Sequence, residues 1–154
     1  MRNLLVAPVA ILVMTLAGCG QPAKAPTEAA AGLVVSEGKL VLPAVKGNSA
    51  AAYFTLANKG SKAVHVAAID IEGAGMAMLH ETREENGHST MVMLDSPEVK
   101  PGESLTLSPG GKHVMVDGLP AGLAPGGTVP MVITLDDGNK LTAPLAVTAF
   151  TVAN

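Results

Sequence analysis

Two histidines and two methionines have side chains that could bind a soft metal ion. Ten residues separate His80 from Met91, twenty-one separate Met91 from His113, and one separates His113 from Met115. Thioether sulfur is a soft, neutral ligand that favours Cu(I), and imidazole suits copper generally. Zinc is more usually held by Cys, His or carboxylate, and calcium or magnesium by oxygen. These residue types therefore point to a copper site.

The first half of this set lies in a methionine-rich stretch that reads as a β-hairpin. Asn-Gly is the favoured dipeptide at the two central positions of a type I′ turn, as at Asn86-Gly87. A hairpin with this two-residue turn would place His80 opposite Met93. A four-residue loop would place His80 opposite Met91 instead. Side chains alternate along a strand, so in either register imidazole and thioether share one face.

The second half lies in the segment GGKHVMVDGL, where His113 and Met115 are two residues apart and therefore share one face of a second strand. The complete spacing, H-x10-M-x21-H-x-M, resembles the signature of the PCuAC copper chaperone family. The segments AAAYFTLANKG, LSPGGKHVMVDGL and VPMVITLDDG extend this resemblance over about residues 33–152.

The resemblance implies a cupredoxin-like β-sandwich that binds one Cu(I) per domain through His80, Met91, His113 and Met115. It further implies an extracytoplasmic metallochaperone that delivers copper toward the dinuclear copper site of cytochrome c oxidase or to an assembly factor. Some family members carry Met beside the first histidine, whereas here Leu79 precedes it and Glu81 follows it. The chain ends without the His- and Met-rich extension of other members, so a single Cu(I) site is expected.

The pattern of apolar residues independently predicts an all-β fold. From residue 33 onward, short apolar or alternating runs are separated by turn sequences, and no segment has a helical period. This pattern predicts an antiparallel β-sandwich or barrel, and with the family resemblance we expect a sandwich of about eight or nine short strands. The clearest hairpin is the pair MVITL and KLTAPLAV around Asp137-Gly138.

The N-terminal residues resemble the signal of a bacterial lipoprotein. Arg2 precedes a short apolar run that ends in LAGC, a lipobox-like sequence at residues 16–19. Residues 1–18 are therefore predicted to be a lipoprotein signal peptide, with Cys19 lipidated and residues 19–32 forming a flexible tether. The alternative is an ordinary signal peptide with a chance cysteine. We expect a lipoprotein of the cell envelope that faces the periplasm, with an outer membrane favoured where the cell has one.

The remaining methionines and histidines receive other interpretations. We expect Met76, Met78 and Met93 to pack around the site and Met131 to lie in the core. His65 is interpreted as structural or solvated and His88 as a solvated turn residue. Whether Met78, Met93 or His88 joins the site stays open.

Composition excludes several classes of function. The net charge is −3 and no basic run is present, so nucleic acid is not an expected partner. A blue-copper electron carrier needs a cysteine thiolate, and Cys19 is the only cysteine. The sequence shows no Ser/His/Asp set and no group of carboxylates that would indicate the active site of an enzyme. Two alternatives to a chaperone stay open: a copper-sequestering or resistance protein without a dedicated acceptor, and a β-sandwich interaction module that binds no metal.

Overall fold

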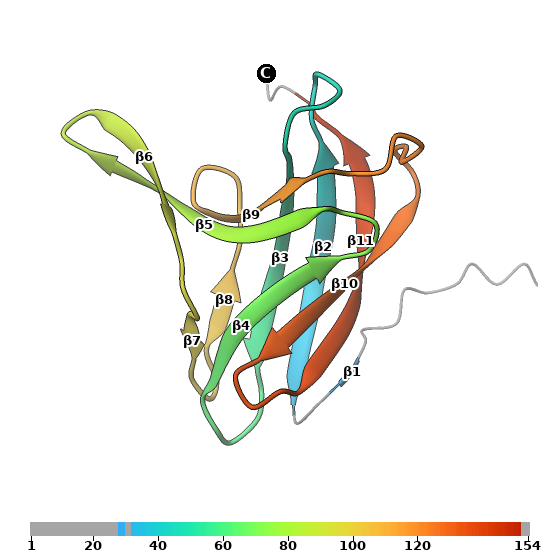
Figure 1. The fold of residues 1–154 in the computed structure, drawn as a ribbon. Coiled ribbons are helices and arrows are strands. Elements are labelled where there is room, and N and C mark those ends of the chain that lie inside the picture. The colour runs from blue at the N-terminus through green and yellow to red at the C-terminus, as the bar shows by residue number, and fades with distance from the viewer. Residues whose placement is uncertain (1–27, 30–31, 152–154) are drawn as a thin grey trace, which may run out of the picture.

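The computed structural model describes residues 28–29 and 32–151, and within them all regular structure is β-strand. None of these residues belongs to a helix long and apolar enough to cross a membrane. The all-β prediction is confirmed. Eight of the strands have six residues or more, and the other three have two or three (Figure 1). The strands are β1 (Glu28–Ala29), β2 (Leu33–Leu42), β3 (Ala50–Asn58), β4 (Val64–Ile71), β5 (Met76–Glu85), β6 (His88–Met93), β7 (Glu98–Val99), β8 (Ser104–Thr106), β9 (Lys112–Asp117), β10 (Thr128–Leu135) and β11 (Lys140–Ala149).

One hydrogen-bonded sheet forms both layers of the sandwich. Its main order is β6-β5-β9-β3-β2-β11-β10-β4-β7, and β1 and β8 pair with β2 and β3 off this path. The sheet folds over so that β4 and β5 lie side by side in front of β2, β3 and β11 (Figure 1). The pairing is antiparallel, as expected, except between β2 and β11, which run parallel.

Alternating burial explains why these segments form strands. In β3 every second residue is buried, including Ala52, Phe54 and Leu56, and β10 and β11 show the same period. Because successive side chains of a strand point to opposite faces, one set fills the space between the layers. The core is built almost entirely from Ala, Val, Leu and Ile, as the scarcity of aromatic residues requires.

Two local features show how turns and bulges set the strands. The hairpin around Asp137-Gly138 is confirmed, because Thr134 pairs with Lys140 and Gly138 has a φ of 83°. The apolar runs LVV and KLVL, which Ser-Glu-Gly separates in the sequence, form one strand, β2. A bulge between Ser36 and Lys39 absorbs the break in alternation, and Glu37 within it has a φ of 56°.

Candidate metal centre

The β5–β6 hairpin adopts the two-residue turn expected for Asn86-Gly87. Both turn residues have positive φ, 53° and 75°, as a type I′ turn requires. β5 and β6 pair so that His80 lies opposite Met93 and Met91 lies opposite Thr82. The first of the two registers considered from the sequence is therefore present, and the four-residue loop is not. The outer part of this hairpin projects from the body of the protein (Figure 1).

The second histidine reaches the first through pairing between β5 and β9. His80 lies directly opposite His113, and Met78 lies opposite Met115. The two imidazole rings are 6.1 Å apart between centroids, with their planes at 61°. Directly opposed residues share a face and have Cβ atoms about 4.5–5.5 Å apart. Three of the four predicted ligands, His80, His113 and Met115, are thus neighbours on one face of the sheet.

The fourth predicted ligand, Met91, lies on the same face but farther out. It is one diagonal step from His80, on the side of the histidine pair opposite to Met115. Its side chain is 53% exposed. The strand pairing therefore places Met91 near His80, on the part of the hairpin that projects from the protein.

His80 has the burial and the missing contact expected of a metal ligand. The residue is only 8% exposed, and its Nδ1 is buried without any hydrogen-bonding partner. An unsatisfied buried polar atom costs about 1–3 kcal/mol, so native proteins rarely keep one without a purpose. A metal ion would take up this nitrogen's lone pair.

His113 is oriented by a contact of the kind that positions metal-binding imidazoles. Its Nδ1 lies 3.0 Å from the carbonyl oxygen of Gly111. Because a carbonyl oxygen can only accept, this hydrogen bond keeps the proton on Nδ1 and leaves the lone pair on Nε2. Metal-bound histidines commonly use one ring nitrogen for such a bond and the other for the metal.

The carboxylate beside the histidine pair is engaged by two cations. Glu81 contacts Lys112 at 2.8 Å and Arg83 at 2.7 Å. The Lys112 ammonium and then the Arg83 guanidinium hold the pKa of the Glu81 carboxyl below its usual value. In the part of the chain that the structure describes, no three His, Cys, Asp or Glu side chains are grouped to hold a metal ion. The available donor set is therefore imidazole and thioether.

The other candidate residues divide between core, surface and groove. Met131 is fully buried, which confirms it as a core residue. His88 is exposed opposite Glu85 at the hairpin end, and the Nδ1 of His65 lies 3.4 Å from the Ser96 carbonyl oxygen. Cys19 and the rest of residues 1–27 lie outside the described residues.

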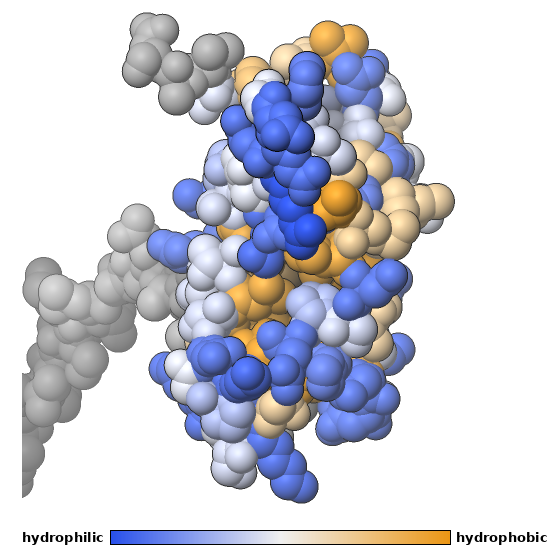
Figure 2. Space-filling view, turned by 90° about the vertical axis from the view of Figure 1, so that its left-hand side faces the viewer, coloured by the Kyte–Doolittle hydropathy of each residue, from blue (hydrophilic) through white to orange (hydrophobic). Residues whose placement is uncertain are grey.

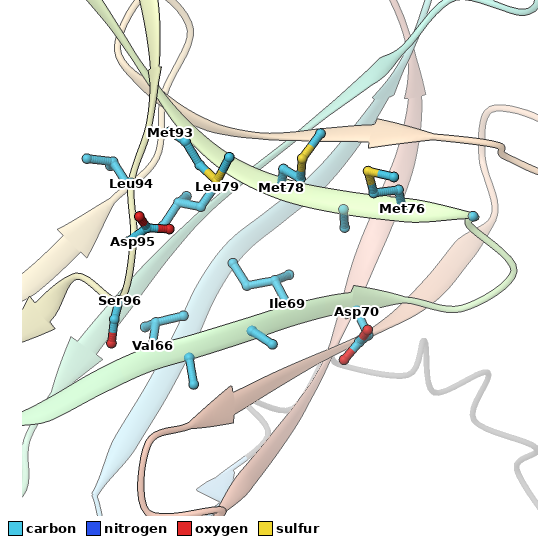
Figure 3. A pocket seen from close by; sticks show the side chains of 14 residues that line it. Val66, Ile69, Asp70, Met76, Met78, Leu79, Met93, Leu94, Asp95 and Ser96 are labelled. Carbon is cyan, nitrogen blue, oxygen red and sulfur yellow. The ribbon is translucent and has the colours of Figure 1, made fainter.

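Met76 and Met93 lie at the surface, where they are 53% and 59% exposed. With Met78 they line a groove of about 370 Å³ between β4 and β5 (Figure 3). The groove forms because the two strands are neighbours in space without being hydrogen-bonded. Figure 2 shows hydrophobic side chains gathered between hydrophilic ones on the side of the molecule from which the hairpin projects. Sequence reasoning missed this groove, and the only signal for it was the alternation of Met76 and Met78.

The fold and the histidine–methionine face define a PCuAC-type domain. A copper-bound PCuAC domain from PmoF2 is similar with a TM-score of 0.66 at 17% identity, over 80% of this chain and 97% of that one. The solution structure of CuI-DR1885 from Deinococcus radiodurans is similar with a TM-score of 0.62 at 28% identity, over 79% of this chain and 80% of that one. The PCuAC resemblance read from the sequence is thereby confirmed.

Within this class, the chain belongs to the LpqE-like family, described as "Putative lipoprotein LpqE-like", which matches residues 23–147. A relative from Leifsonia xyli subsp. xyli, described as "Putative lipoprotein Lxx21020", is 33% identical over 151 residues. The match covers 95% of this chain and 89% of that relative.

Proposed function

We propose that this chain binds one Cu(I) ion outside the cytoplasm through His80, Met91, His113 and Met115 and passes it to an acceptor protein. The observation that carries the proposal is the cross-strand pair His80–His113, with Met115 beside it and a buried imidazole nitrogen left without a partner. The similarity to the solution structure of CuI-DR1885 supports the choice of ion.

The donor set explains why the ion would be Cu(I) and why it could leave again. Two imidazoles and two thioethers bring no charge, and soft sulfur favours the monovalent ion. All four residues lie on paired strands, but Met91 lies on the outer part of the projecting hairpin and is exposed. An acceptor can therefore replace the ligands one at a time, beginning with the thioether that it reaches most easily. No reaction other than ligand exchange is required, so we propose no enzymatic activity.

The proposed location is the cell envelope. The lipoprotein descriptions of the family and of its relative support it, as does the LAGC sequence that ends in Cys19. In this proposal residues 1–18 are removed, a lipid on Cys19 anchors the chain, and residues 19–32 tether the copper domain, residues 33–152. The domain faces the periplasm, on the outer membrane where one exists. The proposed acceptor is the copper site of cytochrome c oxidase or an assembly factor that serves it.

A competition titration tests the binding step. The full chain is titrated with Cu(I) under reducing conditions against a chelator of known affinity, and one ion per chain is expected. Replacing both His113 and Met115 with alanine should weaken binding by more than about tenfold, because changes to outer-shell partners alone cost 10–100-fold. Met131→Leu is the matched control, since this methionine is buried in the core. A stoichiometry other than one, or an affinity unchanged by the double substitution, would contradict the proposal.

A transfer assay tests the chaperone step. The loaded protein is mixed with a copper-free oxidase domain, and copper is followed as it moves between the two. Transfer supports a chaperone. Retention of the ion, with the oxidase domain and with an assembly factor alike, would favour instead a protein that sequesters copper.

A further inference from the structure

The groove between β4 and β5 is a break in the hydrogen-bonded sheet beside the metal face. β5 pairs with β6 only from His80 onward, and β4 pairs with β7 only at Val64 and His65. The facing edges of the two strands, residues 66–70 and 76–79, do not pair with each other and leave the groove of about 370 Å³ between them. Strand edges without a partner strand are places where another chain can dock.

The groove has an apolar floor and an adaptable rim. Val66, Ile69 and Leu79 line it and are at most 8% exposed, so they are core residues that the gap between the strands uncovers. Met76 and Met93 also line it, and they are more than half exposed. Methionine side chains are flexible and are common on surfaces that bind varied apolar partners. The groove can therefore take in large apolar side chains of another protein.

The charge of the groove is negative at both ends. Among the described residues that line it, the charged ones are Asp70 and Asp95, and both are exposed. Figure 3 shows them at opposite ends of the groove. Asp95 lies near the start of β4, because the carbonyl of Pro97 accepts the backbone N–H of Val66. Asp70 is four residues, or about 13 Å, farther along β4 than Val66. This arrangement favours a partner that presents apolar side chains flanked by Lys or Arg.

The same charges disfavour two other occupants. In an isologous contact between two copies of this chain, the same surface meets itself, so Asp70 and Asp95 of one copy would face those of the other. Like charges brought together oppose association. A membrane surface rich in anionic lipids would be repelled for the same reason.

The groove is continuous with the metal face. Met78 lines the groove and lies opposite Met115. Met93 lines the groove and lies opposite His80. Directly opposed residues have Cβ atoms about 4.5–5.5 Å apart. A protein seated in the groove is therefore held beside the residues from which the ion must leave.

We propose that the groove between β4 and β5 is the docking site of the copper acceptor, which inserts apolar side chains between the strands and places basic side chains against Asp70 and Asp95. The carboxylates increase the rate of encounter, and the apolar contact holds the two proteins together while ligands exchange. This inference rests on the proposed function and leaves its four copper ligands unchanged. It adds the surface that orients the acceptor and the chemistry of the acceptor's own contact surface.

The test measures the rate of copper transfer. The full chain in detergent micelles, loaded with one equivalent of Cu(I), is mixed with a copper-free oxidase domain or with an assembly factor, at several salt concentrations. Asp70→Asn combined with Asp95→Asn should slow transfer by about tenfold at low salt. The difference should shrink as salt rises, because charges more than about 10 Å apart are largely screened at 0.1 M.

A second variant tests the apolar part of the groove. Ala68 lines the groove and is exposed, so Ala68→Phe fills the groove without disturbing the core. This variant should slow transfer by about tenfold at every salt concentration, because the acceptor loses the pocket for its apolar side chains. The competition titration should give the same Cu(I) affinity for both variants as for the unaltered chain.

Glu103→Gln combined with Asp136→Asn is the matched control. Both residues are exposed in turns and neither lines the groove, so this variant removes the same two negative charges elsewhere. It should leave the transfer rate unchanged.

Transfer rates that the groove variants leave unchanged, or that the control lowers as much, would overturn the inference and leave the proposed function standing. Self-association of the unaltered chain that Ala68→Phe abolishes would also overturn it, because the groove would then hold a second copy. If the unaltered chain gives its Cu(I) to neither protein, the transfer step of the proposed function is wrong, and this inference is wrong with it.

Discussion

Replacing His80 with leucine should show how much stability the metal-free protein loses by burying this imidazole and how much stability Cu(I) binding adds. In the metal-free protein this imidazole is 8% exposed and its Nδ1 has no hydrogen-bonding partner. Such a group costs about 1–3 kcal/mol, and an apolar side chain of similar size removes that cost. The free energy of unfolding of metal-free His80→Leu should therefore equal that of the unaltered protein or exceed it by up to about 3 kcal/mol.

With Cu(I) bound, the unaltered protein should be more stable than His80→Leu. An ion that binds only the folded state stabilises it by about 2.7 kcal/mol at a hundredfold excess over its dissociation constant. Each tenfold loss of affinity in the variant removes about 1.4 kcal/mol of that stabilisation. For a chain of this length, 1 kcal/mol shifts the melting temperature by roughly 2–4 °C. Thermal and denaturant unfolding, followed by circular dichroism with and without Cu(I), measures both effects.

Asn58 provides the control for this experiment. It is the other buried polar residue of the described chain, and its side chain makes three hydrogen bonds with the backbone, at Gly60, Lys62 and Val99. Asn58→Leu should destabilise the protein by about 1–3 kcal/mol or more, with or without copper, because it leaves buried backbone groups unpaired. If metal-free His80→Leu loses as much stability as Asn58→Leu, His80 is a structural residue and the reasoning is refuted.

Three further predictions concern the core and two titrating groups. Met131→Ala should lower the free energy of unfolding by about 2–5 kcal/mol and leave Cu(I) affinity unchanged in the competition titration; a change in affinity would contradict its assignment to the core. Burial raises the pKa of Tyr53, so the phenolate absorbance of this single tyrosine should appear above its usual pH, and the associated stability should be lost as the pH rises through that raised pKa. Lys112 and Arg83 lower the pKa of Glu81, so the carboxyl resonance of Glu81 should titrate below the usual range, and its contribution to stability should be lost as the pH falls through that lowered pKa. An ordinary midpoint would show that Tyr53 is not buried as described, or that the ion pairs of Glu81 are not formed in solution.

The sequence predicted those features of the site that depend on neighbouring residues in the chain. Asn86-Gly87 fixes a two-residue turn, and that turn fixes the pairing of His80 with Met93. The alternation of His113 and Met115 placed both on one face without knowledge of the neighbouring strand. These features depend on residues that are close together in the chain.

The remaining features depend on segments that are distant in the chain. The pairing of His80 with His113 joins residues thirty-three positions apart, and no local signal specifies which strand β5 will meet. The family resemblance, rather than periodicity, supplied that contact. The parallel pairing of β2 with β11 and the groove between β4 and β5 arise from the way one sheet folds over itself, which no single segment encodes. The burial of His80 is likewise a tertiary property, and so is the exposure of Met93.

X-ray absorption spectroscopy of the full chain loaded with one equivalent of Cu(I) tests the central claim most directly. We predict a monovalent copper edge with both nitrogen and sulfur neighbours, and a loss of nitrogen neighbours in His80→Leu. A coordination sphere that lacks either sulfur or nitrogen, or that His80→Leu leaves unchanged, would contradict the assignment of copper to the face shared by His80, His113 and the methionines.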